Sequence, residues 1–122
     1  MTNLDIQAKT TKTATFDGTG VDVSGITGDW TLNLEILAMN DGDTVRFQFT
    51  DSVDNFSSDV LAGPTTAFTG KIVNYSAPFK RSWKKADFPD LRMGTASAKL
   101  RLSITAFSGS SKSITYQAYV QY

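Results

Sequence analysis

The chain has 122 residues, with 12 basic and 12 acidic side chains, no histidine and no cysteine. Without histidine a Ser-His-Asp triad cannot form, and without cysteine there is no thiol nucleophile and no cysteine-based zinc site. This length is typical of one domain, which buries roughly two-thirds of the surface of its unfolded chain. These numbers exclude most catalytic classes, and we expect one domain that is not an enzyme and holds no cofactor or metal.

The net charge of the whole chain is zero, but charged residues are distributed unevenly between its two halves. Residues 1–61 carry ten acidic and three basic side chains, a net charge of −7, whereas residues 62–122 carry two acidic and nine basic ones, a net charge of +7. One interpretation is a bipolar surface that favours head-to-tail contact between copies. The other, which we favour, is that strands from the two halves interleave in one fold, so that the charges mix.

Residues 1–12 are polar and threonine-rich, and they contain no aromatic side chain. Such a segment is typical of an extended terminus, so we assign residues 1–12 to an N-terminal arm and residues 13–122 to a single domain. Met1 is followed by neither a basic nor an apolar stretch, which argues against a secretory signal peptide. No apolar run approaches the length of a membrane span, and we expect no membrane partner.

Apolar residues fall on alternate positions in two pairs of segments. The first pair, Trp30–Ile36 and Val45–Phe49, flanks the turn at residues 40–43 and predicts a hairpin. The second pair, residues 98–106 and 114–122, alternates in the same way around the turn at residues 108–111. Further strands are predicted between glycine and proline signals at Thr10–Phe16, Val21–Ile26, Ala67–Tyr75 and Phe79–Lys84.

The composition also favours strands and turns. Eleven of the twelve acidic residues are aspartate, which prefers turns and caps, and serine and threonine together number 28. Residues 51–59 and 86–94 fit no strand. The first segment is predicted as a long loop or one helical turn, and the second as an ordered loop held by Phe88 and Leu91. With about eight strands and no helical period, the predicted fold of residues 13–122 is all-β, an antiparallel β-sandwich or jelly roll.

Several acidic and amide side chains offer oxygen ligands of the kind that Ca²⁺ prefers. They are Asp41, Asp43, Asp51, Asp54, Asn55 and Asp59. Their spacing matches no EF-hand, and such residues are common in turns without a metal, so we favour turn roles. Glycosidase chemistry needs two carboxylates that flank a cleft, whereas Glu35 is the only glutamate and is predicted on the outward face of a strand.

The most basic segment contains Lys80, Arg81, Lys84 and Lys85 around Trp83. Basic residues interleaved with aromatic ones can bind single-stranded nucleic acid. The chain as a whole is neutral, however, and a dedicated nucleic-acid binder usually has a basic excess. We therefore favour a core tryptophan on an edge strand guarded by lysines, and we expect no nucleic-acid partner.

Aromatic residues could form a stacking platform for sugars, with Trp30, Tyr75, Trp83, Tyr116, Tyr119 and Tyr122 as the candidates. Tyr119 falls on the strand face opposite Tyr116, which makes it the better candidate for an exposed contact. Phe107 is in register with polar residues and is also predicted on the outer face. Two exposed aromatic residues on one hairpin indicate a contact surface, although scattered apolar residues on the surface are equally consistent with the pattern.

A small cysteine-free β-sandwich with a threonine-rich N-terminal arm and a strand at its C-terminus resembles small bacteriophage virion proteins, in particular capsid decoration and other head or tail accessory proteins. The local signals nearest to that resemblance are residues 47–56 and 81–94. The resemblance implies a virion location after assembly in the host cytoplasm. It also implies binding to coat or other virion proteins, oligomers of the chain itself, and stabilisation of a capsid or tail as the activity.

Contact of this kind uses sheet edges, arm exchange and aromatic anchors, without covalent chemistry. The predicted contact residues lie in the arm, the basic segment and the outer face of the C-terminal pair of strands: Leu4, Ile6, Lys9, Lys12, Lys80, Lys84, Lys85, Phe107 and Tyr119. The alternative function is a carbohydrate-binding or adhesive module in which Tyr119 contacts the glycan.

Overall fold

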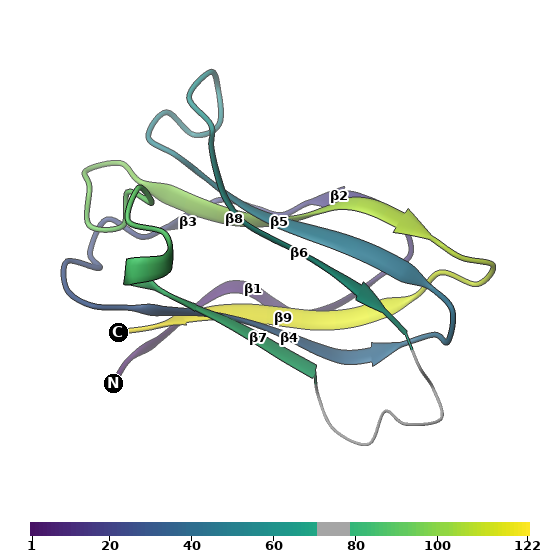
Figure 1. The fold of residues 1–122 in the computed structure, drawn as a ribbon. Helices are drawn as coiled ribbons and strands as arrows, with labels where there is room; N and C mark the ends of the chain where they lie inside the picture. The colour runs from purple at the N-terminus through teal and green to yellow at the C-terminus, as the bar shows by residue number, and fades with distance from the viewer. Residues whose placement is uncertain (71–78) are drawn as a thin grey trace.

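The computed structural model describes residues 1–70 and 79–122 (Figure 1). In this part of the chain, nine strands and one short 3-10 helix follow one another. They are β1 (Asn3–Lys12), β2 (Phe16–Asp17), β3 (Val21–Asp22), β4 (Thr31–Met39), β5 (Thr44–Ser52), β6 (Leu61–Thr69), β7 (Phe79–Lys84), η1 (Lys85–Asp87), β8 (Lys99–Ser108) and β9 (Ile114–Gln121). The all-β prediction is confirmed, and the strand predicted at Phe79–Lys84 has the observed bounds of β7.

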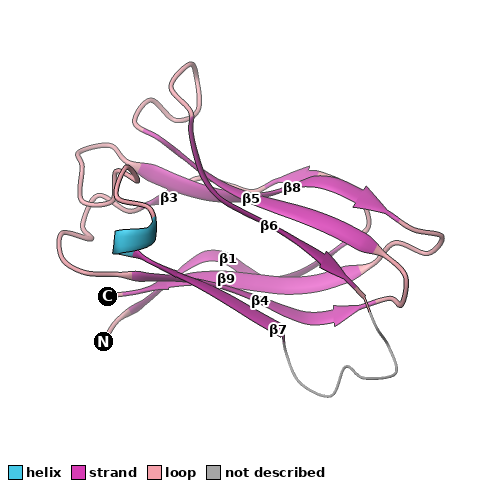
Figure 2. Cartoon of the chain, viewed as in Figure 1, coloured by secondary structure: helices cyan, strands magenta, loops and turns pink. Residues whose placement is uncertain are grey.

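The strands form two antiparallel sheets that pack face to face (Figure 2). The four-stranded sheet has the order β1-β9-β4-β7. The five-stranded sheet has the order β2-β8-β5-β6, and β3 also pairs with β8. Residues 71–75 of the predicted strand Ala67–Tyr75, and with them Tyr75 as a stacking candidate, lie outside the described residues.

The pairs nest around a single hairpin. The hairpin is β5 with β6, and outward from it β4 pairs with β7, β2 and β3 pair with β8, and β1 pairs with β9. The chain is therefore one long antiparallel ribbon rolled into two sheets, which is the strand order of a jelly roll. Each nested pair joins a strand of the acidic half to one of the basic half, so the charges of the two halves interleave as expected.

The core lies between the sheets and follows from the alternation in the sequence. In β4 the inward side chains Leu32, Leu34 and Ile36 are fully buried, and in β9 every second residue from Ile114 to Val120 is buried. Phe47 in β5 packs edge to face against Tyr116 and Phe68, with ring centroids 4.9 and 6.0 Å apart. Inward residues of both sheets thus interdigitate in one apolar layer.

Two predicted hairpins are wrong. The turn at residues 40–43 joins β4 of the four-stranded sheet to β5 of the five-stranded sheet, and the turn at residues 108–111 joins β8 to β9 in the same way. Both turns are therefore corners between the sheets. Alternation identifies the buried face of a strand but does not identify its partner, because both arrangements bury the same residues.

The N-terminal segment is also different from the expected arm. Asn3–Lys12 is β1, an edge strand that pairs with β9 from Asn3 opposite Gln121 to Lys12 opposite Ile114. Beyond the strand ends, the backbones of Thr2 and Tyr122 exchange hydrogen bonds of 2.6 and 2.9 Å. The two termini lie side by side at one end of the sandwich (Figure 1). The first dozen residues are thus part of the sandwich, because Leu4 and Ile6 alternate inward and bury apolar surface.

No helix in the described ranges is long and apolar enough to span a membrane.

One buried polar atom in the core lacks a partner. The hydroxyl of Tyr116 is buried and makes no hydrogen bond in the described structure, and desolvation raises the pKa of Tyr116 to about 12. Because an unsatisfied buried hydroxyl destabilises the folded state, Tyr116→Phe should raise the free energy of unfolding by about 1–3 kcal/mol, measured by urea denaturation.

The effect of this substitution should also depend on pH. The Tyr116 hydroxyl ionises near pH 10 in the unfolded chain and near pH 12 in the folded protein, so wild-type stability falls over this range. The stability difference between Tyr116→Phe and the wild type should therefore grow from pH 10 to pH 12. A Tyr116→Phe variant that is less stable than the wild type would contradict the conclusion that the Tyr116 hydroxyl is buried without a partner.

Candidate binding face on the four-stranded sheet

The outer face of the four-stranded sheet is polar across three adjacent strands. Its side chains alternate with the core residues of β7, β4 and β9, and we call them the polar face: Thr31, Asn33, Glu35, Lys80, Ser82, Lys84, Gln117, Tyr119 and Gln121. Glu35 lies opposite both Lys80 and Gln117, and Asn33 lies opposite both Ser82 and Tyr119. The pairing register therefore arranges these residues in rows that cross the sheet.

Glu35 is the centre of one hydrogen-bonded network. Its Oε2 accepts a bond of 2.8 Å from Nε2 of Gln117, and its Oε1 accepts a bond of 2.8 Å from the hydroxyl of Tyr119. These two bonds, and the charge of Lys80, lower the pKa of Glu35. Lys80 Nζ lies 5.7 Å from the centroid of the Tyr119 ring. The carboxylate thus stays ionised and fixes the orientation of two neighbouring side chains.

Asn33 organises the next row. It is only 1% exposed although it is on the outer face, because neighbouring side chains cover it. Its Oδ1 accepts a bond of 2.7 Å from the hydroxyl of Ser82, and its Nδ2 donates to the carbonyl of Thr31 and to Oε1 of Gln121, at 3.3 and 3.4 Å. A satisfied buried amide of this kind fixes the rotamers of the groups around it.

The polar face continues into a cleft at one end of the sheet. The row of Thr31, Lys84 and Gln121 forms part of the wall of this cleft, and the cleft has a volume of about 380 Å³. Its other lining residues are Met1, Asp29, Trp30 and Tyr122. Tyr122 is 40% exposed. The cleft therefore adds an accessible aromatic ring to the hydrogen-bonding groups of the face.

Strand β7 is an open edge of the same sheet. It pairs with β4 alone, so one side of its backbone has no partner strand in the described structure. On its inner face, Trp83 packs edge to face on Phe49 and Phe79 packs edge to face on Phe68, with centroids 5.8 and 5.0 Å apart. Lys80 and Lys84 point to the other face. The structure thus agrees with a partly buried tryptophan on an edge strand that carries lysines.

The structure brings together three of the nine predicted contact residues. Lys80, Lys84 and Tyr119 all belong to the polar face, and Lys80 and Lys84 are exposed. Lys85 follows directly in η1, where its Nζ donates to the carbonyl of Gly28 at 3.4 Å. These four residues come from β7, η1 and β9, and they share one side of the sheet or its edge.

The four predicted residues of the arm lie at the opposite edge of that sheet, in β1. Ile6 is 3% exposed and belongs to the core, so its expected role as a contact residue is wrong for the folded protein. Leu4 is half-buried against the same core. Lys9 is exposed, and Lys12 lies with its Nζ 3.8 Å from the centroid of the Phe16 ring. Lys9 is thus the one fully exposed residue among these four, and Lys12, like Leu4, is half-buried.

Phe107 is on the inner side of the five-stranded sheet, not on its outer face. The pairing of β5 with β8 shifts between Arg46 and Phe47, so Thr105 is an extra residue in β8. This bulge places Phe107 opposite Val45, which is 2% exposed, and Phe107 packs against the core. A one-residue insertion reverses the face of every residue that follows it, which is why the alternation predicted the wrong side.

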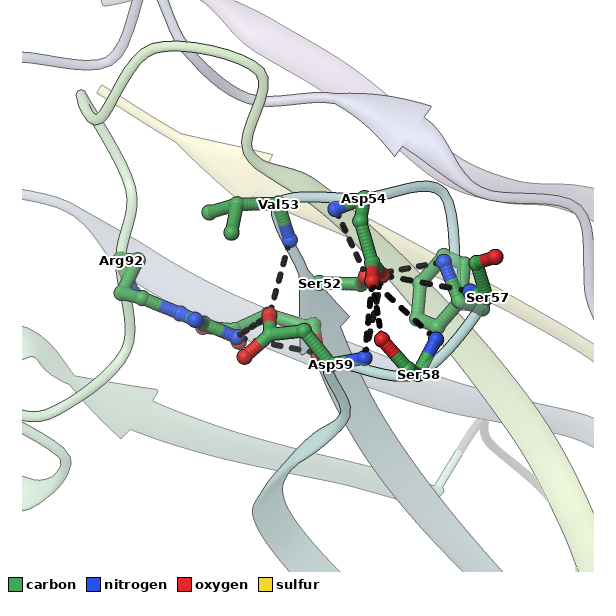
Figure 3. A network of polar contacts seen from close by, with 9 residues as sticks. Ser52, Val53, Asp54, Ser57, Ser58, Asp59 and Arg92 are labelled. Atoms are coloured by element: carbon green, nitrogen blue, oxygen red, sulfur yellow. Dashed lines mark hydrogen bonds and ion pairs between the residues drawn. The ribbon is translucent and has the colours of Figure 1, made fainter.

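A second polar cluster stabilises the loop after β5, residues 53–60 (Figure 3). Asp51 is 2% exposed in its side chain, and its Oδ1 lies 2.6 Å from Nη2 of Arg92, which also lies 2.6 Å from Oδ2 of Asp59. The Arg92 backbone N–H donates to Oδ2 of Asp51 at 2.8 Å. The bond from Arg92 is the main cause that lowers the pKa of Asp59, and both carboxylates raise the pKa of Arg92. One arginine thus joins two loops of the chain.

Asp54 stabilises the same loop through hydrogen bonds to residues within it. Its carboxylate accepts bonds from the hydroxyls of Ser58 and Ser52 and from the backbone N–H groups of residues 57–59, and the Ser58 hydroxyl is the first of the causes that lower its pKa to about 2. These bonds hold Asn55 and Phe56 at φ values of 57° and 61°, a left-handed conformation that asparagine tolerates but that is unfavourable for phenylalanine.

Five of the six oxygen-rich residues considered for Ca²⁺ accept hydrogen bonds from protein groups. Asp51, Asp54 and Asp59 accept bonds within the loop cluster, and Oδ2 of Asp43 accepts a bond of 3.3 Å from the Ser113 backbone. Within residues 1–70 and 79–122, no three acidic side chains are grouped as metal ligands. The arrangement supports turn and loop roles for these carboxylates.

Several important residues were not singled out from the sequence. Asn33, Gln117 and Gln121 stand on outward positions of alternating strands, which the sequence does reveal, but their meeting depends on the strand order. Arg92 had no such signal, since its partner Asp51 is 41 positions away. Comparison of the chain with protein-family models, with curated proteins and with solved structures finds no match in any of the three.

Proposed function

We propose that the chain is a non-enzymatic structural protein that binds a coat or other virion protein and stabilises a capsid or tail assembly. Two observations support this proposal. The strand order is that of a jelly roll, an architecture that viral capsid proteins use. The four-stranded sheet also ends in an edge strand that is open to another protein.

The open edge of β7 carries the proposal. Five of its six residues are exposed, and its outer backbone groups can add a strand from a partner. The segment from Lys80 to Lys85 contains four basic side chains and no acidic one. Two copies of β7 paired with each other would place like charges opposite one another, which is unfavourable. The edge therefore selects an acidic segment of a different protein.

Co-sedimentation with virions purified from the source of the gene tests this function. We expect saturable binding that weakens as salt rises, because exposed charges are screened. The double substitution Arg81→Glu and Lys84→Glu should weaken binding by at least about tenfold, since it places like charges against an acidic partner.

A matched control reverses two basic residues away from β7, with Arg46→Glu and Lys112→Glu, both of which are exposed. This variant should bind like the wild type. If the wild-type protein stays in the supernatant at all protein concentrations, the proposed function is wrong. Equal loss in both double variants would show that only the net charge of the protein matters.

A further inference from the structure

We propose that the polar face is a carbohydrate-binding site, which accepts a neutral oligosaccharide laid across β7, β4 and β9. This activity is separate from the virion function proposed above. Lys80 and Lys84 are four residues apart on one strand, so the face extends roughly 13 Å along β7, and the distance from β7 to β9 is roughly 10 Å. These dimensions suit a short run of sugars rather than a single ion.

Two glutamine side chains on β9 present complementary groups. Gln117 donates to Glu35 through its Nε2, which leaves Oε1 as an acceptor without another bond in the described structure. Gln121 accepts from Asn33 through its Oε1, which leaves Nε2 as a donor. An acceptor and a donor are thus fixed four residues apart on the same face of one strand. Sugar hydroxyls both donate and accept, so they match such a pair, whereas a simple ion needs only one of the two.

The groups on this face are held in place before a ligand arrives. Glu35 orients Gln117 and Tyr119, and the buried Asn33 orients Ser82 and Gln121. Side chains that are already fixed lose little conformational entropy on binding, which favours affinity for a small polar ligand. Tyr119 is half-buried and offers an amphipathic ring beside these groups.

The composition of the face argues against a protein as its occupant and for a neutral ligand. The large hydrophobic side chains that are exposed in the described structure are Met1, Val60, Phe79 and Tyr122, and none of them belongs to the polar face. A protein interface usually has an apolar centre. The charges of Lys80 and Lys84 are balanced by those of Glu35 and of Asp5, which lies opposite Tyr119 on β1. A neutral polysaccharide therefore fits better than an acidic one.

Affinity electrophoresis in native gels tests this site with dextran and hydroxyethylcellulose as neutral probes and polygalacturonate as the acidic one. We expect at least one neutral polymer to retard the wild-type protein. Gln117→Ala and Tyr119→Ala should each weaken that retardation at least about tenfold. Gln48→Ala, a glutamine between the inward Phe47 and Phe49 on the five-stranded sheet, should migrate like the wild type.

Thermal melting of each variant verifies that it is folded before its binding is interpreted. The proposal is overturned if no neutral polymer retards the wild-type protein, if polygalacturonate alone does so, or if both polar-face variants are retarded as strongly as the wild type. Loss of binding in Gln48→Ala as well would also overturn it. None of these results depends on virion binding, so the two proposals stand or fall separately.

Discussion

Deletion of residues 1–12 is expected to unfold the protein or to leave it marginally stable. The deletion removes β1, which covers one edge of the four-stranded sheet and pairs with β9 along most of its length. It also removes Ile6, which is 3% exposed, and truncation of a buried isoleucine alone costs about 2–5 kcal/mol. A domain of ordinary stability has only about 5–15 kcal/mol in total.

Urea denaturation and thermal melting of the truncated chain measure this effect. The single substitution Ile6→Ala separates the loss of core packing from the loss of the strand, and Lys9→Ala, an exposed residue of the same strand, should change stability by less than about 0.5 kcal/mol. A truncated protein that melts like the wild type would contradict the assignment of β1 to the sandwich and would restore the interpretation of this segment as an arm.

The second large effect is expected for Arg92→Met, with a loss of about 3 kcal/mol in the free energy of unfolding. The substitution leaves the buried carboxylate of Asp51 without its ion pair, and breaking a buried pair usually costs about 3–5 kcal/mol. The lower end applies because the backbone N–H of residue 92 still donates to Asp51 and because the arginine side chain is 26% exposed.

Equilibrium urea denaturation measures this loss, and Arg46→Met provides the control, since Arg46 is an exposed arginine. That control should change stability by less than about 0.5 kcal/mol. The loop after β5 should also exchange its amide hydrogens faster in Arg92→Met, because Asp59 loses the partner that joins it to the second loop. A stability change as small as that of the control would show that Asp51 does not depend on this ion pair.

The layer structure was predictable from the sequence because alternation reports directly on burial. Leu32, Leu34 and Ile36 were assigned to one face, and all three are fully buried. The partner of each strand was not predictable in this way. The segments around residues 40–43 look like a hairpin, yet the two strands belong to different sheets. Strand order depends on contacts far apart in the chain, which a local pattern does not encode.

The predictions for Phe107 and for the N-terminal segment were wrong, each because of a local feature. The extra residue Thr105 in β8 turns Phe107 toward the core, and a single-residue bulge has no marker in an otherwise regular strand. At the N-terminus the signal was present, because Leu4 and Ile6 alternate with polar residues as in a strand. The threonine-rich composition of residues 1–12 outweighed that short alternation in the prediction.

The membership of the candidate site was predictable in part, and its geometry was not. Glu35 and Tyr119 were both placed on outward faces, and both are found there. Their hydrogen bond joins residues 84 positions apart, and it exists only because β4 and β9 are neighbours. The charge asymmetry of the two halves now has a structural meaning, because the rolled ribbon pairs strands of the acidic half with strands of the basic half.

Hydrogen–deuterium exchange of the protein, free and bound to virions from the source of the gene, tests the central claim most directly. The account predicts that amides of residues 79–84 become protected on binding, because a partner strand pairs with the open edge of β7. Amides of β2 and β3, at the far edge of the other sheet, should exchange as in the free protein. Binding without protection of residues 79–84, or protection confined to another part of the sandwich, would contradict the claim.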